Sequence, residues 1–197
     1  ALHLLFQSLP TILPARHWLT TRAVAMYLFW LMLADRRELI ISYGGFVGRR
    51  ATQKRSDAFS RTIEAIVAMA AGERDNALAA YEGVLVSIRD TVNSPWILPY
   101  EMDFLLLFIG NFPEAFASEY GEDLWRSQRF RPLLKKILPL VQHRRHRKRA
   151  IPELIKARLF EVFRMKNVKF SYDTALKRSR LSEQPLVEMI CRVWFAR

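Results

Sequence analysis

Apolar residues recur along most of this chain every three or four positions, which is the spacing of one face of an α-helix. One helix is predicted to begin at Ser56 or Asp57 and to end before Gly72. The apolar face of this helix consists of Phe59, Ile63, Ile66, Val67 and Ala70. A second helix is predicted over about residues 75–91. Its apolar face consists of Ala77, Leu78, Tyr81, Val84, Leu85 and Ile88.

Glycine and proline residues set the limits of the other helices predicted in the first 123 residues. An N-terminal helix is predicted over about residues 16–40, and the glycines of residues 43–48 end it. The Ser94–Pro95 pair predicts the N-cap and first residue of another helix. The Gly110–Asn111 pair ends that helix, and a further helix is predicted over about residues 113–120.

Three apolar stretches predict further helices in the last third of the chain, at residues 132–141, 152–165 and 182–197. The chain contains only seven glycines, which is few for a sheet protein that needs many tight turns. We therefore predict an all-α fold of antiparallel helical hairpins, packed as a bundle or a short solenoid, with a basic C-terminal helical region.

A spacing of small and aromatic residues recurs in the middle of the chain. In residues 72–85, Gly72 precedes the small residue Ala77 by five positions, and the aromatic Tyr81 follows after four more. Residues 110–115 repeat the glycine and the small residue 38 positions later. This pattern resembles the tetratricopeptide repeat, whose period is 34 residues. The resemblance implies pairs of antiparallel helices, in which the small residue allows close approach and the aromatic fills the gap to the next repeat.

The N-terminal segment contains no acidic residue before Asp35, and it carries scattered Arg, Ser and Thr residues. This composition resembles that of a mitochondrial transit region or of a segment beside one, but the segment is too apolar and too poor in Arg for a typical transit peptide. Its apolar run, residues 23–34, extends only about 18 Å as a helix, whereas a bilayer has a hydrocarbon core of about 30 Å. Extending the run back to Trp18 would bury Arg22 in lipid. We therefore expect a buried core helix and no transmembrane span.

Charge is distributed unevenly along the chain. The 31 Lys and Arg residues outnumber the 19 Asp and Glu residues, which gives a net charge of +12. Residues 1–71 carry +5, residues 72–123 carry −8 and residues 124–197 carry +15. We predict two parts: a helical domain over residues 1–123, with an apolar first helix and an acidic middle, and a basic helical region over residues 124–197. A surplus of this size indicates a polyanionic partner.

The strongest functional signal is a basic segment over residues 129–180, which holds seventeen Lys or Arg and three acidic residues. So dense a cluster repels itself unless an anion neutralises it, and arginine suits phosphate through its bidentate guanidinium. We predict contact with the phosphate backbone of RNA. A solvated basic surface and contact with anionic lipid are the alternatives. The predicted RNA-binding residues are Lys135, Lys136, His143, Arg144, Arg145, His146, Arg147, Lys148, Arg149, Lys156, Arg158, Lys166 and Lys169.

Two aromatic residues, Phe170 and Tyr172, follow Lys166 and Lys169 in this segment. Aromatic side chains beside cations stack on the bases of single-stranded RNA. Aromatic residues at helical spacing more often belong to a protein core, and we favour the core for both.

Other chemistry is sparse. His143 and His146 have the spacing of a helical metal face, but the surrounding cations repel a metal ion, so we predict no metal and no cofactor. No motif for acid–base or nucleophilic catalysis is present, and we do not expect an enzyme. Cys191 is the only cysteine, which excludes an internal disulfide and fits a reducing compartment.

In overall style the chain resembles accessory proteins of organellar ribosomes, being basic, helical and free of acidic residues at its start. The resemblance implies a structural subunit of a large ribonucleoprotein, the mitochondrial ribosome of the matrix. Its basic last third would neutralise rRNA phosphates, and its acidic middle would contact neighbouring proteins. The alternative is a helical-repeat interaction adapter or an accessory subunit of a mitochondrial membrane complex.

Overall fold

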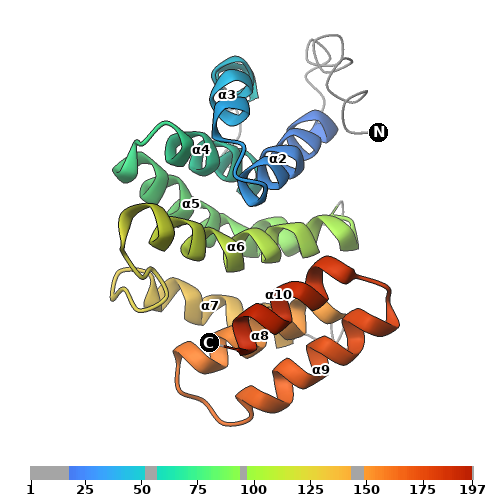
Figure 1. Cartoon of the computed structure of the whole chain (residues 1–197). Coiled ribbons are helices and arrows are strands. Elements are labelled where there is room, and N and C mark those ends of the chain that lie inside the picture. The colour runs from blue at the N-terminus through green and yellow to red at the C-terminus, as the bar shows by residue number, and fades with distance from the viewer. Residues whose placement is uncertain (1–17, 52–56, 94–96, 143–148, 197) are drawn as a thin grey trace. The chain divides into compact units, whose positions relative to one another are not determined.

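The computed structural model describes residues 18–51, 57–93, 97–142 and 149–196. These residues form nine helices and no strand, which confirms the predicted all-α fold (Figure 1). The helices are α2 (Trp18–Leu33), α3 (Arg37–Ala51), α4 (Ala58–Ala70), α5 (Arg74–Asn93), α6 (Pro99–Tyr120), α7 (Arg131–Gln142), α8 (Ala150–Val162), α9 (Val168–Leu181) and α10 (Pro185–Phe195).

The chain forms two compact units, residues 1–87 and residues 88–197. The sequence placed the boundary at residue 123, where the net charge changes sign. Helix α6, which precedes residue 123, packs against α8, which follows it.

In the first unit, α2, α3 and α4 pack against one another. The helix predicted over residues 16–40 is two helices, because Asp35 has a positive φ of 52° and ends α2. The prediction that residues 43–48 end a helix was also wrong, since α3 continues through them to Ala51. A Cβ atom on Gly44 would lie 2.4 Å from a methyl carbon of Val67. This glycine therefore permits the close approach of α3 to α4 rather than making a turn.

The helices predicted on either side of Gly72 are confirmed as α4 and α5. Asp57 is the N-cap of α4, and its side chain accepts a hydrogen bond of 2.8 Å from the backbone N–H of Ser60. Ala77 and Tyr81, which carry the tetratricopeptide resemblance, are fully buried in α5.

Four of the described helices end in the same motif. Asp35, Gly72, Arg164 and Glu183 follow the ends of α2, α4, α8 and α9, and each has a positive φ. In each case the backbone N–H of this residue donates to the carbonyl three residues back, and the next N–H donates to the carbonyl five residues back. This is the Schellman motif, in which glycine is the usual left-handed residue. Only Gly72 matches that preference.

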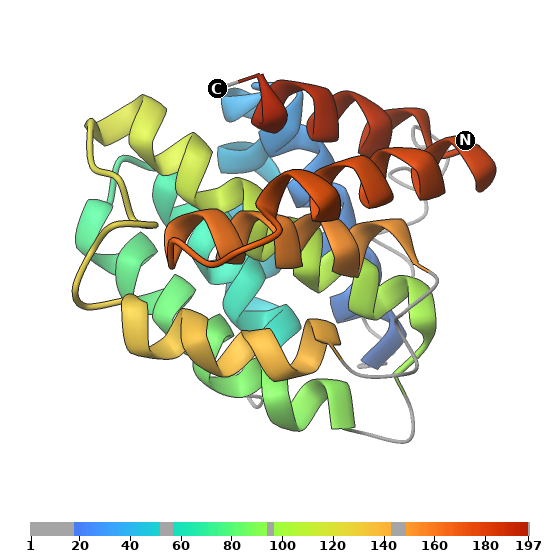
Figure 2. The same cartoon turned by 90° about the horizontal axis from the view of Figure 1, so that it is seen from below.

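In the second unit, α8 packs against α6, α7, α9 and α10. Figure 2 shows α8, in orange, between α7, in gold, and the red helices α9 and α10. Most of α8 is buried, including Leu154, Ile155 and Leu159. The predicted helices over residues 132–141 and 152–165 correspond to α7 and α8.

Helix α6 is longer than the sequence predicted. It begins at Pro99, after the N-cap Leu98, and not at Pro95, which lies outside the described residues. It also runs through Gly110, where the sequence placed a helix end. A Cβ atom on Gly110 would lie 2.6 Å from Ile155 of α8 and 2.7 Å from the ring of Trp194 of α10. Gly110 therefore serves close helix packing, and the second half of the repeat-like spacing does not fall at a turn.

Pro113 lies inside α6 and does not end it. Aromatic side chains one helical turn apart line the helix on both sides of this proline. The ring centroids of consecutive members of Phe108, Phe112, Phe116 and Tyr120 are 5.3, 5.9 and 4.6 Å apart. Packing of this row in the core outweighs the local cost of a proline within a helix.

Candidate nucleic-acid interface

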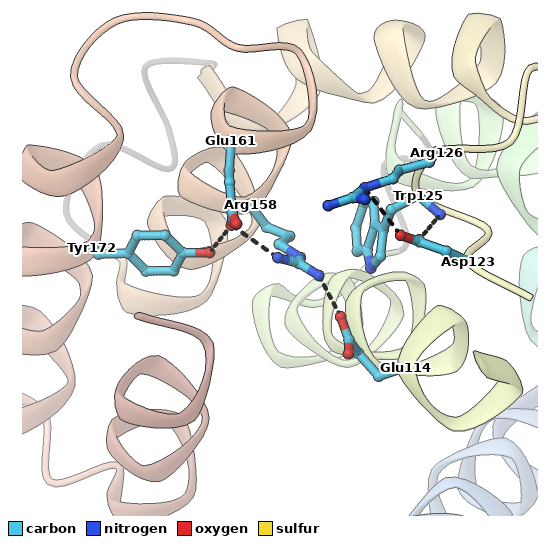
Figure 3. Close-up of polar contacts among 7 residues, drawn as sticks. All are labelled: Glu114, Asp123, Trp125, Arg126, Arg158, Glu161 and Tyr172. Carbon is cyan, nitrogen blue, oxygen red and sulfur yellow. Dashed lines mark hydrogen bonds and ion pairs between the residues drawn. The ribbon is translucent and has the colours of Figure 1, made fainter. Parts of the chain in front are cut away.

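Arg158 projects from α8 into a network of polar contacts (Figure 3). Its Nη2 donates to a carboxylate oxygen of Glu114 on α6 at 2.6 Å, and its Nη1 donates to Glu161 at 2.8 Å. The hydroxyl of Tyr172 on α9 donates to the same Glu161 at 3.0 Å. These bonds connect three helices of the second unit.

Two tryptophan rings lie close to this guanidinium. The Cζ atom of Arg158 is 5.4 Å from the ring centroid of Trp125 and 5.8 Å from that of Trp194. Burial opposes the positive charge, but the hydrogen bond to Glu161 and the charge of Glu114 outweigh it and raise the pKa of Arg158. Arg158 is therefore permanently charged, and its charge is engaged in ion pairs within the protein.

A pocket of about 660 Å³ opens beside this network. On the side of Arg158 away from Tyr172, Figure 3 shows Trp125 and Arg126, which come from the α6–α7 connection. Asp123 accepts a hydrogen bond of 3.0 Å from the backbone N–H of Trp125 and pairs with Arg126 at 3.3 Å. The residues that line the pocket include Asp123, Trp125, Arg126, Arg131, Glu161 and Arg164, in addition to Arg158.

Two of the pocket arginines have no carboxylate partner among the described residues, namely Arg131 and Arg164. Arg131 begins α7 and lies 5.2 Å from the ring centroid of Phe163. Lys135, one turn further along α7, lies 5.9 Å from the same ring. Because Phe163 is the C-cap of α8, two cations of α7 approach an aromatic ring at the end of α8.

Four of the predicted RNA-binding residues are exposed. Lys135 and Lys136 lie on the outer face of α7, Lys166 lies in the α8–α9 connection, and Lys169 lies in the first turn of α9. None of these lysines has a carboxylate partner among the residues that the structure describes. They are therefore available to an external anion.

Three other predicted residues form ion pairs within the protein. Arg149 pairs with Asp103 and also donates to the carbonyl of Pro99. Lys156 pairs with Glu153, which Arg178 also contacts at 2.8 Å. Arg158 pairs with Glu114 and Glu161. These pairs satisfy cations that the sequence assigned to RNA.

The remaining predicted residues, His143, Arg144, Arg145, His146, Arg147 and Lys148, lie outside the described residues. The two aromatic residues, Phe170 and Tyr172, differ in burial. Tyr172 is buried, as expected of a core residue, but Phe170 is 69% exposed beside Lys169. The preference for the core was therefore wrong for Phe170.

Sequence reasoning missed the pocket itself. Arg131 and Arg164 were counted in the basic segment, but no spacing connects them with Trp125 or Arg126. In the described part of the chain, no group of three or more His, Cys, Asp or Glu side chains is arranged to hold a metal ion. None of the described helices combines the length and the apolar character needed to cross a bilayer.

Comparison with known proteins identifies no relative of this chain, because no family model, curated protein or solved structure matches it.

Proposed function

We propose that this protein is a structural, RNA-contacting subunit of a large ribonucleoprotein, and that the second unit neutralises RNA phosphates. The observation that carries the proposal is the gathering of cations without carboxylate partners around the α7–α8 contact. Arg131 and Lys135 of α7 both approach Phe163, and Arg164 and Lys166 follow it directly in sequence.

The distinction between paired and unpaired cations supports this proposal. Arg158, Lys156 and Arg149 are used in internal ion pairs, so they stabilise the fold. The exposed lysines have no such role among the described residues, so their charges are open to an external anion. Neutralising a polyanion also releases its condensed counterions, which favours binding at low salt.

The exposed ring of Phe170 adds a second kind of contact. It lies next to Lys169 in α9, with most of its side chain in solvent. An aromatic ring beside a lysine suits an unpaired base next to its phosphate, because stacking does not depend on base identity. Phosphate contact with stacking favours single-stranded or irregular RNA, such as that at the surface of a ribosome.

The assembly proposed is the mitochondrial ribosome. Support comes from residues 1–34, which lack acidic side chains and carry scattered Arg, Ser and Thr, and from the acidic residues 72–123, which suit basic protein neighbours. Sedimentation of the tagged protein from mitochondrial lysate tests this assignment. We expect migration with ribosomal particles that RNase abolishes. Migration with a membrane complex that RNase does not change would instead favour the accessory-subunit alternative.

RNA contact is tested by replacing the four exposed lysines. The test variant is Lys135→Gln, Lys136→Gln, Lys166→Gln and Lys169→Gln in one chain. Each lost phosphate contact reduces the slope of log K against log salt by about 0.7 for single strands, so we expect a reduction of about 3. The control is Arg36→Gln with Arg89→Gln, two exposed arginines outside this surface. A slope equal to that of the wild type would remove RNA contact through these lysines.

A further inference from the structure

The pocket beside Arg158 collects four guanidinium groups from three segments of the second unit. Arg126 comes from the α6–α7 connection, Arg131 begins α7, and Arg158 and Arg164 come from the end of α8. The two carboxylates of its lining, Asp123 and Glu161, are already bound by Arg126 and Arg158. The lining therefore carries two more positive than negative charges.

The residues of the pocket lining also include N–H donors that lack hydrogen-bond acceptors in the described part of the chain. Nε1 of Trp125 and Nε of Arg158 are both fully buried, and neither has an acceptor among the described residues. A buried N–H group without an acceptor is costly, and native proteins rarely retain one without a reason. These two enclosed N–H groups belong to residues of the lining, and the positive charge that the pocket presents comes from its guanidinium groups.

The backbone at Arg164 gives an independent reason to single out this residue. Arg164 has a φ of 53° and occupies the left-handed position of the Schellman motif that ends α8. Glycine adopts this conformation without steric cost, whereas arginine does not. Strained backbone positions are enriched at functional sites, and Asp35 and Glu183 occupy the same position elsewhere in this chain. Here the strained position places an arginine without a carboxylate partner among the described residues in the pocket lining, to which Arg131 also belongs.

We propose that this pocket binds a phosphate group between Arg131 and Arg164, on a ligand of about nucleotide size. A volume of about 660 Å³ is ample for one nucleotide and lies in the usual range for small-molecule sites. Arginine suits the phosphate through its planar, bidentate guanidinium. The phosphate belongs either to an RNA strand or to a free nucleotide, and only the first of these sources rests on the proposed function.

Calorimetric titration of the full chain tests the pocket with two probes, adenosine 5′-monophosphate and a twelve-nucleotide RNA. The test variant is Arg131→Gln with Arg164→Gly. The charge-matched control is Arg36→Gln with Arg89→Gln. We expect at least a tenfold loss of affinity for the mononucleotide in the test variant and less than a twofold change in the control. Equal affinity in the wild type and the test variant would overturn the proposal, as would the absence of mononucleotide binding to the wild type.

A second pair of variants separates binding from folding. Arg164→Gly alone relieves the left-handed strain, so we expect a higher unfolding midpoint together with weaker mononucleotide binding. Glu183→Gly relieves the same strain at the end of α9, outside the pocket lining, and should raise the midpoint without weakening binding. If Arg164→Gly bound the mononucleotide as tightly as Glu183→Gly, the proposed role of Arg164 would be wrong.

The two proposals fail in different ways. A protein that binds the mononucleotide through Arg131 and Arg164 but does not bind RNA would contradict the RNA-contacting function and leave the pocket assignment intact. Suppose instead that replacement of the four lysines lowers the RNA affinity, while Arg131→Gln with Arg164→Gly leaves the mononucleotide affinity unchanged. That result would contradict the pocket assignment alone.

Discussion

Nη2 of Arg158 lies 2.6 Å from Oε1 of Glu114, although 44 residues separate the two along the chain. Their side chains are 13% and 20% exposed, so water screens the pair only weakly. The pair joins α8 to α6 and is supported by Glu161 and Tyr172. In so enclosed a setting, the loss of one partner leaves a charge that the protein has to desolvate without compensation.

The first prediction concerns this pair. Glu114→Gln should lower the free energy of unfolding by about 2 kcal/mol, because the buried negative charge that pairs with Arg158 is lost and only a neutral acceptor remains, while Arg158 keeps Glu161. Urea unfolding followed by circular dichroism measures the change. Asp123→Asn is the control, since the side chain of its partner Arg126 is 88% exposed and such pairs contribute at most about 1 kcal/mol. Equal effects of the two substitutions would contradict the importance of the buried pair.

A second prediction compares two glycines inside helices. Gly110→Ala should destabilise the protein by about 1–3 kcal/mol, because the added methyl group would overlap Ile155 and Trp194. Gly83→Ala should be neutral or stabilising by up to about 1 kcal/mol. Its Cβ would meet only the flexible side chain of Arg61, and alanine favours the helix. Thermal unfolding measures both, and a similar change in the two variants would contradict this packing argument.

A third prediction concerns alkaline pH. Burial, and then the charge of Glu161, raise the pKa of Tyr172 above its usual value. The neutral phenol is therefore favoured in the folded state, so its contribution to stability is complete below about pH 10 and is lost as the pH rises through the folded-state pKa. Tyr172→Phe should lose less stability than the wild type between pH 9 and pH 11. Urea midpoints at the two pH values test this, and an unchanged pH dependence would contradict it.

The fourth prediction concerns Cys191. Burial, and then the charge of Glu188, raise the pKa of this thiol from 9.0 to about 12. Because the thiolate is the reactive form, its population at pH 8 should be about a thousandfold lower than that of an unperturbed thiol. Native protein should therefore react with a disulfide reagent far more slowly than protein in denaturant. Comparable rates in the two conditions would show that the thiol is accessible.

The elements that the sequence predicted well are those with local signals at both ends. Helix α4 is preceded by its N-cap Asp57 and followed by Gly72, and each of these residues acts within one turn of the helix end. The break after α2 was missed because Asp35 adopts a left-handed conformation that glycine or asparagine would have indicated more clearly.

The errors at Gly44 and Gly110 have one physical cause. A glycine that makes a turn and a glycine that permits close packing look alike in the sequence. Their roles depend on Val67 for Gly44 and on Trp194 for Gly110, which are distant in the chain. Tertiary contacts therefore decide whether such a helix ends or continues.

The sequence predicted which kinds of residue the candidate interface contains, but it did not predict how these residues are arranged in space. The density of Lys and Arg indicates a polyanion, yet it does not show which cations the fold uses internally. Arg149 and Arg158 pair with acids of α6, far from them in sequence. Only the three-dimensional contacts separate these structural cations from Lys135 and Lys166, and only these contacts bring Arg131 and Arg164 to one pocket.

The central position of α8 has a consequence for how residues 88–197 come apart. Since α6, α7, α9 and α10 all pack on this one helix, displacing it exposes apolar surface on each of them at once. Without α8, the main contact that remains among these helices is that of α9 with α10. The backbone amides of α8 should therefore exchange with solvent only when the whole unit opens, and their rate is a direct measure of its cooperative stability.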